Sequence, residues 1–142
     1  MMETTNDFGE RELSMIMPMA KWKRDGGFLT KYAEYYRYTM RIDGFACAHA
    51  DGKGAGLLTK PFTFEGNKLE MNFRTSAGGF VKVAMTDEDG NVLEGFEDVR
   101  LFGDSIERPV DFTGDLAALN GKVVRMQLQM RDADVFSFKF HN

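Results

Sequence analysis

The chain has 142 residues, 43% of them hydrophobic, which is enough for one globular domain with a core of its own. Its net charge of −4, without a long basic run, argues against nucleic acid or a membrane surface as a partner, because phosphate groups bind to a concentrated positive patch. The single cysteine excludes an internal disulfide, and no stretch approaches the roughly 20 apolar residues that cross a bilayer.

The N-terminal third combines a strand with a segment that has no regular pattern. Residues 1–7 are polar and lack the features of a signal peptide, so the cytoplasm is the default expectation for a compartment that the sequence does not encode. Leu13, Met15 and Met17 recur at a spacing of two, which predicts a strand. Residues 20–34 have no clear period and predict a long loop, which is uncommon inside a compact domain unless it is functional. We therefore expect residues 1–35 to be a strand and loop that remain from, or contact, a neighbouring domain, and residues 36–142 to be a β-sandwich domain.

Alternation of apolar and polar residues dominates the rest of the chain. In residues 68–74, Leu69, Met71 and Phe73 fall on one face of a strand and the polar residues fall on the other. Further segments repeat this alternation, with apolar positions at Tyr36, Tyr38, Met40 and Ile42; at Val81, Val83 and Met85; at Val124, Met126, Leu128 and Met130; and at Phe136, Phe138 and Phe140. One apolar and one polar face per strand is typical of antiparallel sheets packed on one side.

Turn residues separate these segments. Residues 87–91 predict a hairpin turn with Gly90 in the left-handed region, and residues 132–134 predict the link between the last two strands. Residues 114–121 predict one helical turn with Asp115 as its N-cap. The sequence thus predicts an all-β fold: an antiparallel two-sheet β-sandwich, jelly-roll-like, with about eight strands and one short helical turn near residues 115–120.

A series of short motifs runs through roughly the last hundred residues. They are residues 41–45 (Arg-Ile-Asp-Gly-Phe), 57–62 (Leu-Leu-Thr-Lys-Pro-Phe), 72–79 (Asn-Phe-Arg-Thr-Ser-Ala-Gly-Gly), 103–105 (Gly-Asp-Ser), 116–121 (Leu-Ala-Ala-Leu-Asn-Gly) and 131–138 (Arg-Asp-Ala-Asp-Val-Phe-Ser-Phe). In this order they resemble the C-terminal β-sandwich domain of uncharacterised bacterial proteins related to the propeller-type glycoside hydrolases, the invertase and levanase kind. In such proteins the β-propeller carries the catalytic carboxylates, and the sandwich packs beside it. The resemblance implies a chain without the catalytic domain and with a structural role.

The sequence contains no motif typical of an enzyme site. Gly90 follows Asp87 too early for a calcium-binding EF-hand loop, which places its glycine at the sixth position. Cys47 lies in an apolar run and is expected to be a small buried residue, and His49 and His141 lack the spacing of zinc ligands. We predict no enzymatic activity and no cofactor. The question of a structural calcium ion in some loop is left open, because the sequence indicates no residues that would bind it.

Aromatic side chains in the N-terminal third are the best candidates for a binding role. Trp22, Tyr32, Tyr35 and Tyr36 lie close together in the sequence. They would fill the seam against a neighbouring domain, stack on sugar rings, or pack as ordinary surface or core residues. The predicted function is a non-catalytic accessory module of a glycoside-hydrolase-like protein that binds a neighbouring propeller-like domain or a second copy of itself. The alternative is a carbohydrate-binding module that uses these four rings.

Overall fold

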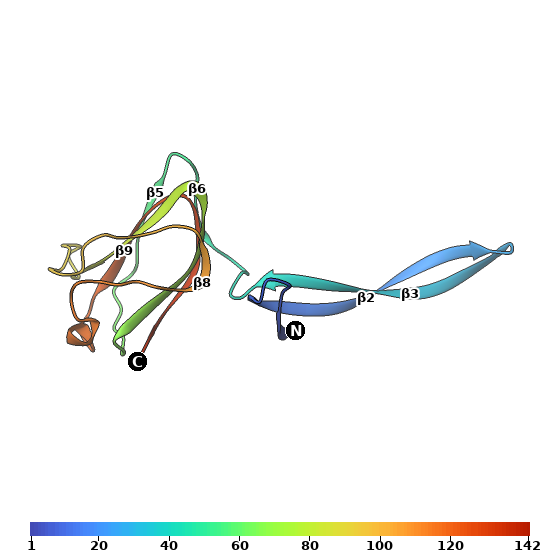
Figure 1. The fold of residues 1–142 in the computed structure, drawn as a ribbon, viewed down its shortest axis with the longest axis horizontal. Helices are drawn as coiled ribbons and strands as arrows, with labels where there is room; N and C mark the ends of the chain where they lie inside the picture. Colours follow the sequence, from blue (N-terminus) through green and yellow to red (C-terminus); the bar gives the residue numbers. More distant parts are fainter. The chain divides into compact units, whose positions relative to one another are not determined.

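Antiparallel strands build both parts of the molecule. The computed structural model describes residues 1–142, except for the side chains of residues 25 and 28–30. The chain divides into two units, Met1–Gly44 and Phe45–Asn142, and each unit has its own sheet (Figure 1). All nine strands pair in antiparallel fashion, so the predicted all-β class is confirmed.

The first unit, which we call the hairpin unit, is a three-stranded sheet in the order β1–β2–β3. β1 spans Met2–Thr5, β2 spans Arg11–Asp25 and β3 spans Phe28–Arg41. β2 and β3 pair from their bases to the turn, where only Gly26 and Gly27 remain outside the ladder. Both glycines have positive φ, 54° and 88°, as a two-residue type I′ turn requires.

The long loop predicted for residues 20–34 is wrong. These residues extend the two strands of the hairpin up to its turn. A Gly-Gly pair between two strands is a hairpin signal, but apolar residues on both faces of this hairpin hide the alternation that would have drawn attention to it. The hairpin unit ends at Gly44, beyond residue 35, where the sequence placed the division.

The second unit, which we call the sandwich unit, is built on two long paired strands, β6 and β9. Its six-stranded sheet has the order β4–β9–β6–β7, with β5 added on β9 and β8 added on β6. The strands are β4 (Ala48–Ala50), β5 (Ala55–Leu58), β6 (Lys68–Thr86), β7 (Val99–Leu101), β8 (Asp104–Pro109) and β9 (Arg125–His141).

A large bulge divides the β6–β9 ladder into two halves. Between the pairs Thr75↔Ala133 and Phe80↔Arg131, residues 76–79 of β6 stand opposite Asp132 alone. Asp132 has a positive φ of 42°, and a Cβ on Gly79 would lie only 2.4 Å from the Asp132 carbonyl oxygen, so this close crossing requires glycine. The link between strands predicted for residues 132–134 is therefore wrong, because these residues form a bulge inside one continuous strand.

The two halves of the sheet share one hydrophobic core. In β6 the buried positions are Leu69, Met71 and Phe73 before the bulge and Val81, Val83 and Met85 after it. In β9 the buried face changes from even to odd numbers at the bulge: Met126, Leu128 and Met130, and then Ala133 and Val135. The unit is sandwich-like, as predicted, although the layers are halves of one bent sheet (Figure 1).

The predicted helical turn is confirmed as a 3₁₀ helix over Leu116–Leu119. The Asp115 carboxylate accepts a hydrogen bond from the Ala117 amide at 2.9 Å, as expected of an N-cap. Leu116 and Leu119 are buried in the core of the sandwich unit. No helix in the described chain is long and apolar enough to cross a bilayer.

Candidate interaction surface

The register of β2 and β3 gives the hairpin unit two distinct faces. Directly paired residues of antiparallel strands point to the same face, so each pair can be assigned to one side. We call one side the apolar face; it holds Leu13, Met15, Met17, Met19, Tyr36, Tyr38 and Met40, with Lys21, Tyr32 and Glu34 nearer the turn. We call the other side the mixed face; it holds Glu12, Ser14, Ile16, Pro18, Ala20, Trp22, Lys31, Ala33, Tyr35, Arg37 and Thr39.

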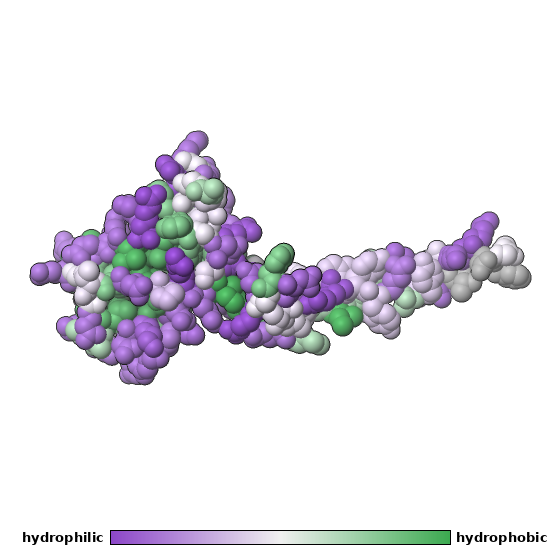
Figure 2. Space-filling view, viewed as in Figure 1, coloured by the Kyte–Doolittle hydropathy of each residue, from purple (hydrophilic) through white to green (hydrophobic). Residues whose placement is uncertain are grey.

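The apolar face is uncovered over most of its length. Its three central methionines and two of its tyrosines keep 37–47% of their surface exposed: Met15, Met17, Met19, Tyr36 and Tyr38. In the space-filling view, residues of hydrophobic and intermediate hydropathy lie at the surface along the hairpin unit (Figure 2). If each of these large side chains offers on the order of 80 Å², the patch covers several hundred Å², the size at which an exposed apolar patch marks an interaction site.

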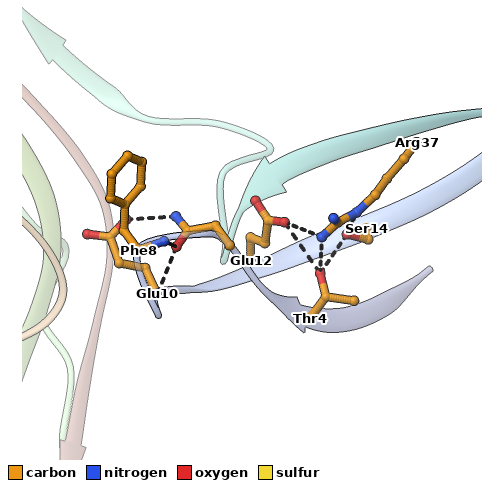
Figure 3. Close-up of polar contacts among 7 residues, drawn as sticks. Thr4, Phe8, Glu10, Glu12, Ser14 and Arg37 are labelled. Carbon is orange, nitrogen blue, oxygen red and sulfur yellow. Dashed lines mark hydrogen bonds and ion pairs between the residues drawn. The ribbon is translucent and has the colours of Figure 1, made fainter.

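The mixed face is held together at its base by a polar network around Arg37 (Figure 3). Arg37 donates hydrogen bonds to Ser14 Oγ at 3.0 Å, to Thr4 Oγ1 at 3.1 Å and to Glu12 Oε1 at 2.6 Å. Thr4 lies in β1, Glu12 and Ser14 in β2 and Arg37 in β3, so one guanidinium group ties together all three strands. Polar side chains therefore join all three strands on this side of the sheet, whereas the base of the apolar side carries an ion pair between β1 and β2, from Arg11 to Glu3.

Nearer the turn, the apolar face carries a small charged cluster. The Lys21 ammonium lies 2.5 Å from Glu34 Oε2 and 2.6 Å from the Tyr36 hydroxyl, which itself donates to Glu34. The hydrogen bonds from Lys21 and Tyr36 lower the pKa of Glu34, and the bond to Glu34 raises the pKa of Lys21. The cluster is neutral as a whole and holds the Tyr36 ring in place on the face.

The four aromatic residues predicted as a site do not form a single row. Tyr32 and Tyr36 lie on the apolar face, whereas Trp22 and Tyr35 lie on the mixed face. All four rings are exposed, Trp22 at 61% and Tyr35 at 73%, and the Lys31 ammonium lies 5.8 Å from the Trp22 ring. The sequence pattern of Met15, Met17 and Tyr38 predicted strands, but these residues were not among the candidates for a binding role, which were chosen for aromatic side chains close together in the sequence.

A second polar cluster lies in the sandwich unit, around Asp134. Its carboxylate accepts hydrogen bonds from His49 Nδ1 at 2.7 Å and from Arg74 Nε at 2.8 Å, and the Cys47 thiol lies 3.5 Å away. Burial by itself would raise the pKa of Asp134, but the bonds from His49, Arg74 and Cys47 outweigh it and lower the pKa.

Cys47 is not the small buried residue that the sequence predicted, because it is exposed beside this carboxylate. Desolvation and the negative charge of Asp134 raise the pKa of the thiol, which disfavours the thiolate that a nucleophile requires. The Asp134 cluster therefore ties β4, β6 and β9 together, and its chemistry is that of a structural ion-pair network.

The acidic turn at Asp87 is also explained by hydrogen bonds within the turn. The Asp87 carboxylate accepts from the backbone amides of Asp89 and Asn91 and from the Asn91 side chain, and these bonds lower the pKa of Asp87. Gly90 has a φ of 90°, as predicted for this hairpin turn. Among the described side chains, no group of three or more histidine, cysteine or acidic residues is arranged to hold a metal ion.

Comparisons with protein-family models, curated proteins and solved structures found no match to this chain. The resemblance to the sandwich domain of propeller-type glycoside hydrolases therefore depends on the sequence motifs alone.

Proposed function

We propose that this chain is a non-catalytic accessory module of a glycoside-hydrolase-like protein, and that the apolar face of the hairpin unit binds a neighbouring propeller-like domain. The observation that carries the proposal is the exposure of Met15, Met17 and Tyr38 on one continuous face. Methionine and tyrosine are enriched in the cores of protein interfaces, and charged residues are depleted there.

The hairpin unit needs a second layer for physical reasons. An isolated two-stranded hairpin is at best marginally stable in water, and it gains stability from a further strand or from an element packed against it. β1 covers β2 only from Arg11 to Ser14, and β3 has no partner on its outer edge along its 14 residues. A propeller supplies what is missing, because its blades are small antiparallel sheets that pack face to face.

In the absence of such a partner, the same face is expected to bind a second copy of the chain. The resemblance supports the propeller-like domain as the partner of the longer protein, and the exposed area supports association through this face in either case. Self-association is therefore the measurable consequence for the isolated chain.

Sedimentation velocity with the 142-residue chain tests the proposal. We expect association at tens of micromolar, and we expect its loss in the double variant Met15→Ser/Met17→Ser. The matched control is Ile16→Ser, which makes a similar change on the mixed face between these positions. A wild-type chain that stays monomeric at high concentration, or a double variant that associates as the wild type does, would argue against the apolar face as the binding surface.

Carbohydrate binding is the second candidate, and the exposure of Trp22 and Tyr35 on the mixed face favours it. Trp22 of β2 stands opposite Lys31 of β3, and Lys31 is four positions from Tyr35 along that strand. The rings of Trp22 and Tyr35 are therefore separated by about 13 Å along the hairpin. Calorimetric titration with oligosaccharides tests this candidate. Binding that Trp22→Ala and Tyr35→Ala each weaken would support it, and silence across a glycan array would exclude it.

A further inference from the structure

One half of the β6–β9 sheet carries a positive cluster on its outer face. Two guanidinium groups lie near the Phe80 ring of β6, with Arg100 Cζ 4.7 Å and Arg131 Cζ 5.3 Å from the ring centroid. The register explains this arrangement, because Phe80 pairs directly with Arg131 of β9, and Arg100 of β7 pairs with Lys82, the next residue of β6 on the same face.

The charges of this cluster are not balanced. Lys82 has a carboxylate partner, Asp98, at 2.9 Å, but in the part of the chain that the structure describes neither Arg100 nor Arg131 has one. Both guanidinium distances end on the same ring centroid, so the two charges are at most about 10 Å apart, comparable with the Debye length at moderate salt. Arg100 and Arg131 thus place two positive charges close together on the surface of a chain whose net charge is −4.

A hollow of about 380 Å³ lies beside the cluster, lined by Ala77, Gly78, Gly79, Arg100 and Phe102. Arg100 and Phe102 are two positions apart and point to the same side, while Leu101 between them is buried. The Phe102 ring is 66% exposed, and a Cβ on Gly78 would meet nothing within 4 Å, so the floor of the hollow is open. The hollow therefore combines an apolar ring with an unpaired guanidinium group.

We propose that this hollow binds the carboxylate of a small ring-shaped anion. A guanidinium that stacks on an aromatic ring uses its flat face, so the in-plane N–H donors of Arg100 stay available for a bidentate bond to a carboxylate. The ring of the ligand would lie against Phe102, as aromatic side chains favour. Arg131, held by its bond to the Gly78 carbonyl at 3.1 Å, adds a second positive charge from a fixed position.

Titration with benzoate, followed by amide chemical shifts of the 142-residue chain at low salt, tests the proposal. We expect saturable shifts at Gly78, Gly79 and Phe102, an affinity that falls as salt is added, and no such shifts with benzyl alcohol, which lacks the charge. Arg100→Gln should weaken benzoate binding by about tenfold or more, because it removes a charge-assisted pair of hydrogen bonds. Arg100→Lys keeps the charge but not the planar fork, so its affinity for benzoate should lie between those of the wild type and Arg100→Gln.

Two variants separate a binding site from a general charge effect. Arg108→Gln removes an exposed arginine of β8, outside the hollow, and should bind benzoate as the wild type does. Phe102→Ala leaves the cluster charged and should still weaken binding. The proposal is overturned if benzoate produces no saturable shifts, or if folded Arg100→Gln binds as tightly as the wild type. It does not rest on the function proposed above, which concerns the other unit.

Discussion

The two units of this molecule use the same sequence pattern and reach opposite results. In β6 of the sandwich unit, Met71 and Phe73 alternate with polar residues and are fully buried. In β2 of the hairpin unit, Met15 and Met17 occur at the same spacing, yet 40% and 42% of their surface is exposed. The difference is that the bent β6–β9 sheet supplies its own second layer. Alternation thus specifies a strand and its apolar face, but the element that covers this face is a separate question.

The largest expected effect on the free energy of unfolding comes from truncating a large apolar side chain, and this effect should differ between the two units. Phe73→Ala should lower the free energy of unfolding by about 3–5 kcal/mol, because it removes a fully buried ring and leaves a cavity. Met17→Ala should change it by less than about 0.5 kcal/mol, since the side chain is partly exposed. Urea denaturation measures both. Equal losses would mean that the hairpin face is buried in the isolated chain and that our comparison is mistaken.

The sequence predicted the sandwich unit better than the hairpin unit for a physical reason. Leu69, Met71 and Phe73 have polar neighbours on both sides, so their period is unambiguous. Residues 20–34 carry Ala20 and Trp22 on one face and Tyr32 on the other, so neither face is uniformly polar and no period emerges.

Contacts between distant residues could not be predicted at all. Trp22, Tyr32, Tyr35 and Tyr36 were found by composition, but only the register of β2 and β3 places two of them on each face. The Asp134 cluster depends on the bulge at Asp132, because the bulge changes which side chains of β6 and β9 share a face. A bulge has no strong sequence signal, so the partners of Cys47 and His49 stayed hidden.

The next largest effect is expected at Asp134 of the sandwich unit, whose carboxylate is only 13% exposed and has two partners, His49 and Arg74. Asp134→Asn should cost about 1–3 kcal/mol of unfolding free energy, because Arg74 and His49 lose a charged acceptor. The folded pKa of Asp134 is lowered, so this stability is present above the unfolded pKa of about 3.9 and is lost as the pH falls through the folded value.

The difference between wild type and Asp134→Asn should therefore shrink when urea denaturation is repeated at increasingly acid pH. Asp111→Asn, an exposed acidic residue of the same unit, serves as the control and should have little effect at any pH. A loss in Asp134→Asn that grows toward acid pH would show that the carboxylate is not charged in the native cluster.

A smaller effect is expected at the cap of the 3₁₀ helix, which has no counterpart in the hairpin unit. Asp115→Ala should destabilise the protein by about 1 kcal/mol, because the Ala117 amide loses its acceptor while Leu116 and Leu119 remain anchored in the core. Thermal unfolding compared with Asp115→Asn, which keeps an acceptor, is the measurement. If both substitutions have the same effect, the cap contributes through its charge and not through the hydrogen bond.

The smallest expected effect is the coupling free energy of an exposed ion pair, compared between one pair from each unit. In the sandwich unit, a double-mutant cycle with Lys82→Met and Asp98→Asn should give a coupling of about 0.2–0.5 kcal/mol, because both side chains are partly exposed and salt screens them. In the hairpin unit, the cycle with Lys21→Met and Glu34→Gln should give no detectable coupling to global unfolding, even though the two groups lie only 2.5 Å apart. The reason is that a hairpin whose apolar face has no second layer is expected to unfold locally before the β6–β9 sheet unfolds. A clear coupling at Lys21 and Glu34 would instead mean that the two units unfold together, and hydrogen exchange of β2 and β3 amides would then be as slow as that of β6 and β9.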